Sequence, residues 1–345
     1  MSRVPAGARS IVRIALGVSA AAVLLAACGT ATVVTPHVVG SPSISISVPL
    51  ATVACTASNS CVAIGTSNNT VGPVSVGQYR RPNGRWSPLA VPSVPSSSIA
   101  LASCWRSQCL VGGSSLSGDV LWRYDAITQS VLPLAAPPGG SDVHALSCYA
   151  ALSCALVDAG VVGPPRFAIT ADGGTSWTTP IPITPMNHDT VTGLACASEF
   201  HCIVASETPS DLLTLIVTID GGATWTSLTT PASWMALSSI ECRGEHCVAL
   251  VTTSNGSRFV RSSSFATGWT GKTLSGTAIA LACTTLSHCV IVGNIGPSTP
   301  WLVTVHRNTV RGTTLQYVPT PLLSVACGTT ICAAIGLTTV LTITP

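Results

Sequence analysis

Charged and aromatic residues are scarce in this chain of 345 residues, at 8% and 5%. Past the first thirty residues, no apolar run approaches the roughly 20 residues that a transmembrane helix needs. Without Arg3, Arg9 and Arg13 the fifteen basic residues fall to twelve, equal to the twelve acidic residues. This balance excludes the basic footprint of a nucleic-acid-binding protein. The abundant residues are Ser, Thr, Val, Ala and Gly, which favour strands and turns over a helical bundle.

The N-terminus has the pattern of an export signal. Three arginines precede the apolar stretch "IALGVSAAAVLLAA", which ends in "LAAC" at Cys28. This ending resembles the bacterial lipobox, whose cysteine is lipidated and becomes the new N-terminus. The alternative is an ordinary secretory signal with a chance cysteine. We expect a signal peptide over 1–27, a tether over 28–40, and a lipid-anchored protein on the extracytoplasmic face of the cell membrane.

The fourteen remaining cysteines form seven close pairs whose first members follow one another at 49, 44, 48, 46, 41 and 44 residues. A period of 40–50 residues suits one four-stranded propeller blade. The pairs are Cys55 and Cys61, Cys104 and Cys109, Cys148 and Cys154, Cys196 and Cys202, Cys242 and Cys247, Cys283 and Cys289, and Cys327 and Cys332. The sequence therefore predicts an all-β, seven-bladed β-propeller over 41–345.

Each pair lies in a strand–turn–strand pattern such as "LACASEFHCIVA", Leu194 to Ala205. Cysteines at facing positions of a hairpin have about the Cβ separation that a disulfide needs, and export permits oxidation. We expect one short disulfide per blade, between its first two strands. Metal thiolates or a redox dithiol are the alternatives, but four or five intervening residues fit zinc poorly. No metal or other cofactor is expected.

Two segments lie at matching positions after consecutive cysteine pairs. They are "TADGGTSW" from Thr170 to Trp177 and "TIDGGATW" from Thr218 to Trp225. Both match the Asp-box pattern and resemble BNR/Asp-box propellers, a group that includes sialidases, sortilin-type receptors and photosystem assembly factors. In physical terms each box is a turn in which glycines supply positive φ and the aspartate bonds amides. The tryptophan then starts the outer strand. We expect structural roles for Asp172, Gly174, Trp177, Asp220, Gly222 and Trp225.

Strands A to D of each blade are numbered from the axis outward, and the last repeat lacks strand D. The alternating segment "SPSISISVPL", Ser41 to Leu50, stands where other D strands precede an A strand. We therefore expect Ser43–Val48 to complete the last blade and close the ring, which removes exposed sheet edges.

Strand direction places the A–B and C–D turns on one face and the B–C and D–A loops on the other. In the resembling family, ligand sites usually lie on the B–C/D–A face around the central channel. The acids expected on that face are Asp119, Asp142, Asp189, Glu207 and Asp211.

Two further features stand out near the cysteine turns. His201, His246 and His288 precede the second cysteine in successive blades, which suggests an arc for metal or pH sensing, or simply polar turns. Glu241 lies in an inner strand where other repeats have Ala or Ser. It either forms a pair between blades with Arg243 or another base, or serves as a functional carboxylate that lines the channel.

The motifs of a sialidase-like site are missing, namely an arginine triad, a tyrosine nucleophile with its glutamate, and an early Arg-Ile-Pro motif. The sequence therefore favours a non-enzymatic binding or scaffold propeller for a protein or glycan partner. A glycan-active hydrolase or lyase and an envelope assembly factor are the alternatives.

Overall fold

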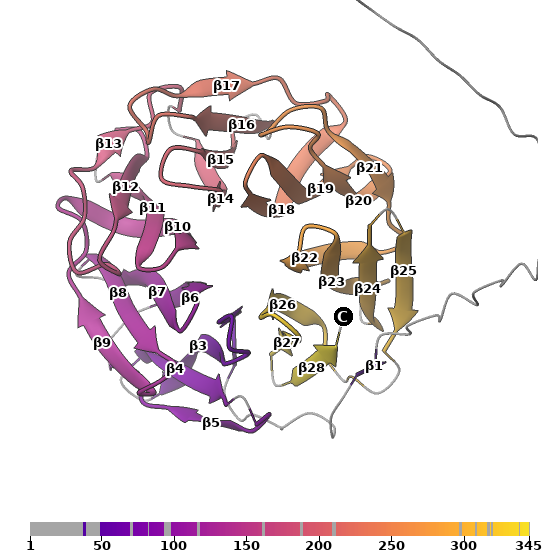
Figure 1. Cartoon of the computed structure of the whole chain (residues 1–345), viewed down its shortest axis with the longest axis horizontal. Coiled ribbons are helices and arrows are strands. Elements are labelled where there is room, and N and C mark those ends of the chain that lie inside the picture. Colours follow the sequence, from indigo (N-terminus) through magenta and orange to yellow (C-terminus); the bar gives the residue numbers. More distant parts are fainter. Residues whose placement is uncertain are drawn as a thin grey trace, which may run out of the picture. The chain divides into compact units, whose positions relative to one another are not determined.

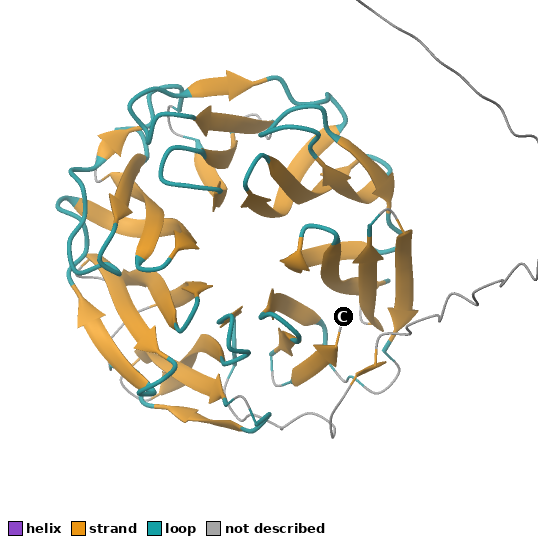
Figure 2. Cartoon of the chain, viewed as in Figure 1, coloured by secondary structure: helices purple, strands orange, loops and turns teal. Residues whose placement is uncertain are grey.

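The computed structural model describes residues 37–38, 49–69, 72–81, 83–92, 98–115, 118–160, 163–186, 189–208, 212–296, 299–307, 309–315, 318, 320–337 and 339–344. These residues form strands and their connections, without a helix among them (Figure 2). It follows that the described part of the chain has no helix suited to crossing a membrane. Seven four-stranded antiparallel sheets surround one axis (Figure 1). The predicted seven-bladed propeller is confirmed.

Blades 1 to 6 are β2–β5, β6–β9, β10–β13, β14–β17, β18–β21 and β22–β25, and blade 7 is β26–β28 with β1. The A strands, which line the axis, are β2 (Thr52–Cys55), β6 (Ser98–Trp105), β10 (Gly140–Ala150), β14 (Thr190–Cys196), β18 (Trp234–Arg243), β22 (Thr277–Thr285) and β26 (Leu322–Cys327). The B strands are β3 (Cys61–Asn69), β7 (Gln108–Ser115), β11 (Ser153–Gly160), β15 (Cys202–Glu207), β19 (His246–Thr253), β23 (His288–Ile295) and β27 (Cys332–Gly336).

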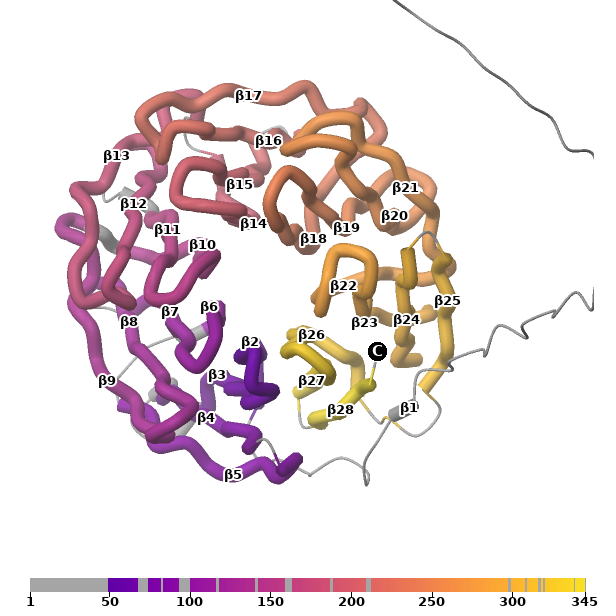
Figure 3. The backbone as a smooth tube through the Cα atoms, in the orientation of Figure 1, coloured from indigo at the N-terminus to yellow at the C-terminus, as the bar shows by residue number. Residues whose placement is uncertain are grey.

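The outer strands form the rim (Figure 3). The C strands are β4 (Gly72–Arg80), β8 (Gly118–Asp125), β12 (Arg166–Thr170), β16 (Leu213–Thr218), β20 (Gly256–Arg261), β24 (Thr299–His306) and β28 (Val340–Thr344). The fourth strands are β5 (Trp86–Leu89), β9 (Ser130–Leu134), β13 (Ile181–Pro182), β17 (Thr226–Leu228), β21 (Thr270–Thr273), β25 (Thr309–Thr314) and β1 (His37–Val38).

Burial explains the sequence of each strand type. B strands such as β15 and β23 are buried over most of their length, because neighbouring blades cover both faces. They accordingly have continuous apolar runs instead of alternating ones. Strand β21 at the rim is exposed at every position and has the polar sequence TGKT. The core thus lies between blades, in clusters that each join two neighbouring sheets.

Each predicted cysteine pair is confirmed as a disulfide between facing residues of strands A and B. The A–B and C–D turns of a blade touch, as when the Gly221 amide donates to the Phe200 carbonyl at 3.2 Å. We call the face with these turns and the disulfides the disulfide face. The face with the B–C and D–A connections is the loop face.

Blades 1 and 7 meet and complete the ring. The amide of Val53 donates to Oγ of Ser324 at 3.3 Å, and Nδ2 of Asn59 donates to Oγ1 of Thr330 at 2.9 Å. One core cluster joins both blades, including Leu50, which is 1% exposed.

The strand β1 pairs with β28 in the register His37↔Thr344 and Val38↔Ile343. These residues belong to the segment 28–40 that the sequence assigned to the tether. The expected closing strand Ser43–Val48 lies outside the described residues, so closure by this segment stays a prediction.

The outer strand of blade 3 differs from its prediction. It was expected to begin at Trp177, but β13 covers only Ile181–Pro182, whereas β17 begins at Thr226, directly after Trp225. Prolines at 180 and 182 cannot donate ladder hydrogen bonds, which shortens this strand.

Candidate functional site

A central channel of about 620 Å³ runs between the seven A strands. Its wall consists mostly of Ala, Ser, Leu and Thr residues with the inner disulfides. Every A strand is an edge strand of its sheet, so one row of its backbone groups has no partner within that sheet. The channel therefore exposes small side chains and main-chain polar groups, a surface suited to binding an extended chain.

Side chains of one blade bind backbone amides of the next around this wall. Oγ of Ser103 accepts from the Cys148 amide at 2.9 Å, and Oγ of Ser147 accepts from the Cys196 amide at 3.0 Å. In blade 5 the equivalent acceptor is Oε1 of Glu241, 3.2 Å from the Cys283 amide. Between blades 5 and 6, Glu241 thus accepts the amide hydrogen bond that a serine accepts between other blades.

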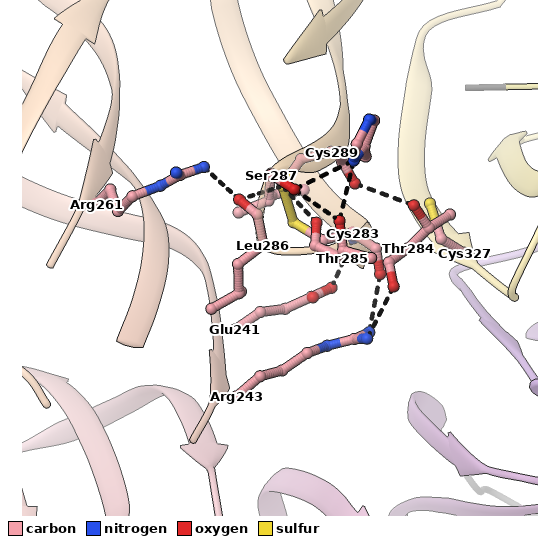
Figure 4. The surroundings of a disulfide bond; sticks show 12 residues. Glu241, Arg243, Arg261, Cys283, Thr284, Thr285, Leu286, Ser287, Cys289 and Cys327 are labelled. Atoms are coloured by element: carbon pink, nitrogen blue, oxygen red, sulfur yellow. Dashed lines mark hydrogen bonds between the residues drawn. A yellow bond between two sulfur atoms is a disulfide. The ribbon is translucent and has the colours of Figure 1, made fainter. Parts of the chain in front are cut away.

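Glu241 is the one carboxylate among the described residues that line the channel. It is half-buried, and loss of water around it raises its pKa to about 7, although the Arg243 charge and the Cys283 amide act in the opposite direction. Figure 4 shows Glu241 and Arg243 side by side beneath the Cys283–Cys289 bridge. Arg243 donates to the carbonyls of Cys283 and Thr284, both at 2.9 Å. The ion pair that the sequence suggested for Glu241 is not among those of the described residues. Glu241 and Arg243 both lie on β18 and bond instead to backbone groups of the next blade.

A second group of ionisable side chains lies at the loop face, between blades 2 and 3. Asp158 is fully buried, and its carboxylate accepts two hydrogen bonds from Arg166, at 2.9 and 3.0 Å. Arg166 also donates to the Pro138 carbonyl at 3.3 Å. Burial raises the pKa of Asp158, and the adjacent guanidinium opposes this effect. Through the Pro138 carbonyl, the pair fixes the connection from β9 to β10 on the loop face.

Asp119 is the neighbour of this pair from blade 2. Both of its carboxylate oxygens are buried and have no hydrogen-bond partner among the described residues. Burial first, and then the charges of Asp158 and Asp142, raise the pKa of Asp119 to about 6. Asp142 itself lies 3.9 Å from Nε2 of His144. We call Asp119, Asp142, Asp158, His144 and Arg166 the acidic mouth.

The structure thus brings together two of the five acids that the sequence placed on this face, Asp119 and Asp142. Asp189 and Glu207 are on blade 4, where Thr190 and Glu207 are facing residues. Asp211 lies outside the described residues. Asp158 and Arg166 were missed, although an aspartate in the apolar strand "CALVDAG" was a visible signal.

The three histidines of the A–B turns have separate surroundings. The ring of His201 contacts Phe265 edge-on at 5.2 Å, whereas His288 stacks on His306 at 4.3 Å between ring centres. Burial, together with the charges of His306 and Arg307, lowers the pKa of His288. His246 is exposed on its turn. Across the described chain, no three His, Cys, Asp or Glu residues are grouped to hold a metal ion.

The two aspartate turns on the disulfide face are built alike. Oδ1 of Asp172 accepts from the amide of Ser176 at 2.9 Å, and Asp220 accepts in the same way from Thr224 at 2.9 Å. Hydrogen bonds within the turn lower the pKa of Asp172 to about 2, and the bond from the Ser176 hydroxyl has the largest effect. All the side-chain oxygens of Asp172 are thus used within the turn.

The glycines and tryptophans complete these turns. Gly174 and Gly222 have φ of 85° and 92°. Trp225 packs edge-on against Phe167 of the preceding blade, at 5.2 Å between ring centres. Trp177 joins a core cluster with Leu121. The side chains of both tryptophans thus contact residues of the preceding blade or of its core cluster.

Several solved structures share this fold. YCF48 from Cyanidioschyzon merolae aligns with a TM-score of 0.62 and 14% identity, over 90% of this chain and 98% of YCF48. YCF48 bound to D1 peptide aligns with a TM-score of 0.61 and 13% identity, over 88% and 95%. Virginiamycin B lyase from Staphylococcus aureus gives 0.64 and 9%, over 88% and 98%. Such low identities show the propeller fold alone.

Comparison of the sequence with protein-family models and with curated proteins gives no match.

Proposed function

We propose that this chain is an extracytoplasmic, lipid-anchored binding propeller that engages a protein partner through its loop face and channel. The observation that carries the proposal is the channel wall. It has small side chains and seven edge strands, and Glu241 is its single carboxylate among the described lining residues. Such a wall offers main-chain and shape complementarity to a polypeptide but no pair of catalytic groups.

The acidic mouth indicates the chemistry of the partner. Asp158 is buried and bound to the guanidinium of Arg166, and the carboxylate oxygens of Asp119 are also buried, so Asp142 is the carboxylate of the acidic mouth that is open to a partner. Negative potential at a binding surface favours a partner segment with lysine or arginine. A structural neighbour, YCF48, has been solved with a bound peptide, which supports a protein partner in preference to a glycan. An assembly role in the envelope is compatible with this binding.

The partner is tested by photo-crosslinking in cells. A crosslinking amino acid at Pro138, exposed beside Arg166, is expected to capture a defined partner. The matched position is Thr175, exposed in an aspartate turn on the other face. Asp142→Asn should weaken capture from Pro138. Equal capture from both positions, unaffected by Asp142→Asn, would show that the loop face is not the binding surface.

The anchor is tested by intact mass and detergent partitioning of the wild type and of Cys28→Ala. We expect a wild-type chain that begins at Cys28, carries lipid and enters the detergent phase. A wild type that is cleaved elsewhere and stays in the aqueous phase would contradict the anchor.

Glycan hydrolysis is the second candidate, because one observation favours it. Asp119, with its pKa raised to about 6, lies near Asp142, and a pair of carboxyl groups is the requirement for acid–base hydrolysis of glycosides. Aryl glycosides, including sialosides, test this directly. Turnover that disappears in Asp119→Asn and Asp142→Asn, or in alanine variants of Glu207, Asp211 or Glu241, would replace the binding function with an enzymatic one.

A further inference from the structure

Five of the six exposed arginines among the described residues gather in the turns of one face. The turns of the disulfide face hold these five, in blades 1, 2, 5 and 6: Arg81, Arg85, Arg106, Arg243 and Arg307. Arg80, Arg123 and Arg261 add charge at the same end of blades 1, 2 and 5. In this sector, from blade 5 through blades 6, 7 and 1 to blade 2, the described carboxylates at this end are Asp125, Glu241 and Glu245. We call these eight arginines the basic arc.

The charges of the basic arc are not neutralised within the molecule. Arg243 donates to backbone carbonyls, Arg261 donates to the Leu286 carbonyl (Figure 4), and Arg81 donates to the hydroxyl of Tyr79 at 2.8 Å. Both ion pairs that join described residues, at Asp142 and Asp158, are on the loop face. Apart from Arg80, which is buried, the arginines of the basic arc are therefore available to an external anion.

Chain direction decides which face lies toward the expected anchor. Strand β28 ends on the disulfide face, where Ile343 faces Cys332 of the last bridge. Because β1 pairs antiparallel with Thr344 and Ile343, the chain enters β1 at that same face. Eight residues, 29–36, separate Cys28 from His37, a reach of at most about 30 Å. A lipid on Cys28 would thus tether the protein through the end of β1 that lies on the disulfide face.

We propose that the disulfide face docks on anionic lipid headgroups through the basic arc, with the acidic mouth directed away from the membrane. Guanidinium groups bind phosphate in a bidentate manner, and arginines near an anionic leaflet are attracted to it within about one Debye length. The acidic mouth would be repelled from the same leaflet, which reinforces the orientation. The inference rests on the proposed anchor at Cys28, and it leaves the loop face free for a partner.

Energy transfer in vesicles tests the orientation. Mature protein whose lipid has been confirmed by intact mass is placed in phosphatidylcholine, or in an equimolar mixture with phosphatidylglycerol, with an acceptor dye on the headgroups. Donor dyes go on non-natural residues at Thr329, exposed on the disulfide face, or at Asn255, exposed on the loop face. In the anionic vesicles, transfer from Thr329 should exceed transfer from Asn255, and salt should reduce the difference.

The triple change of Arg81, Arg85 and Arg307 to Gln should remove that difference, whereas Lys272→Gln, at an exposed rim position toward the loop-face end of β21, should not. Equal energy transfer from Thr329 and Asn255, or transfer that does not depend on lipid charge, would overturn the proposed orientation without contradicting the lipid anchor.

If intact mass shows no lipid, the proposed anchor at Cys28 is wrong, but docking through the basic arc can still be tested. Flotation of the protein with the same vesicles is that test. Each arginine removed should lower binding to the anionic vesicles about five-fold. Flotation that is equal for the wild type and the triple variant would overturn docking by the arc. Release by free inorganic phosphate at a matched concentration would indicate a site for the free anion instead of a membrane surface.

Discussion

Replacing Glu241 with glutamine is expected to stabilise the propeller at alkaline pH. The carboxyl group has a pKa of about 7 in the folded chain, against an ordinary value of 4.5, because burial penalises its charge. The folded state therefore binds the proton more tightly than the unfolded state. The free energy of unfolding then falls as pH rises from about 4.5 to about 7, and the loss is complete above that.

The size of the effect follows from the shift. A difference of about 2.5 pH units corresponds to about 3 kcal/mol, and remaining contact with water in the channel lowers this figure. Glutamine keeps an oxygen that can accept from the Cys283 amide but cannot ionise. We expect Glu241→Gln to be near neutral at pH 5 and to gain up to about 3 kcal/mol at pH 8. For a ring of this size, that is about 5 °C in melting temperature.

Thermal unfolding of both proteins between pH 4.5 and pH 8.5 measures this difference. Glu245→Gln, on the exposed A–B turn of the same blade, is the matched control and should change stability by less than about 0.5 kcal/mol at any pH. If Glu241→Gln loses stability at pH 8, the carboxylate charge is stabilising, through Arg243 or another cation. The argument from desolvation would then be wrong.

Three further changes test the scaffold. The double alanine variant of Cys196 and Cys202 should lose about 2 kcal/mol in urea unfolding and keep its strand content, and collapse of the fold would contradict a simple bridge in each blade. Gly222→Ala should lower the free energy of unfolding by about 1–3 kcal/mol, because a Cβ there would meet the ring of a neighbouring phenylalanine at 2.7 Å and because the residue has φ of 92°. An unchanged melting temperature would refute this crowding. Deleting 41–48 should expose an edge and promote aggregation, seen by light scattering, whereas deleting the equally long 29–36 should not; equal behaviour of the two deletions would exclude closure by the first segment.

The local structure of each blade could be predicted from the sequence because it depends on short-range patterns. Paired cysteines, polar turns and apolar runs specify each A–B hairpin without any neighbour. The segment from Thr170 to Trp177 likewise contains both partners of nearly every bond in its turn. Such motifs repeat in the chain, and the repetition fixes the number of blades.

The acidic mouth could not be predicted in the same way. Asp119 and Asp158 are 39 residues apart in different blades, and their proximity depends on how β10 packs against β7 and β8. The same limit applies to Glu241, because its bonding partner, the Cys283 amide, belongs to the next blade. The sequence singled out Glu241 and placed Asp119 among the acids of the loop face, but only the geometry between blades shows what each one faces.

The placement of the seven bridges makes the ring mechanically asymmetric. Every disulfide closes its inner hairpin at the disulfide face, so separation of strands A and B can begin only from the loop face. Each inner hairpin is therefore covalently closed at the disulfide face, whereas at the loop face it is held by hydrogen bonds and packing alone. A partner that arrives at the loop face meets the ends of the hairpins that can separate, while the opposite ends stay joined.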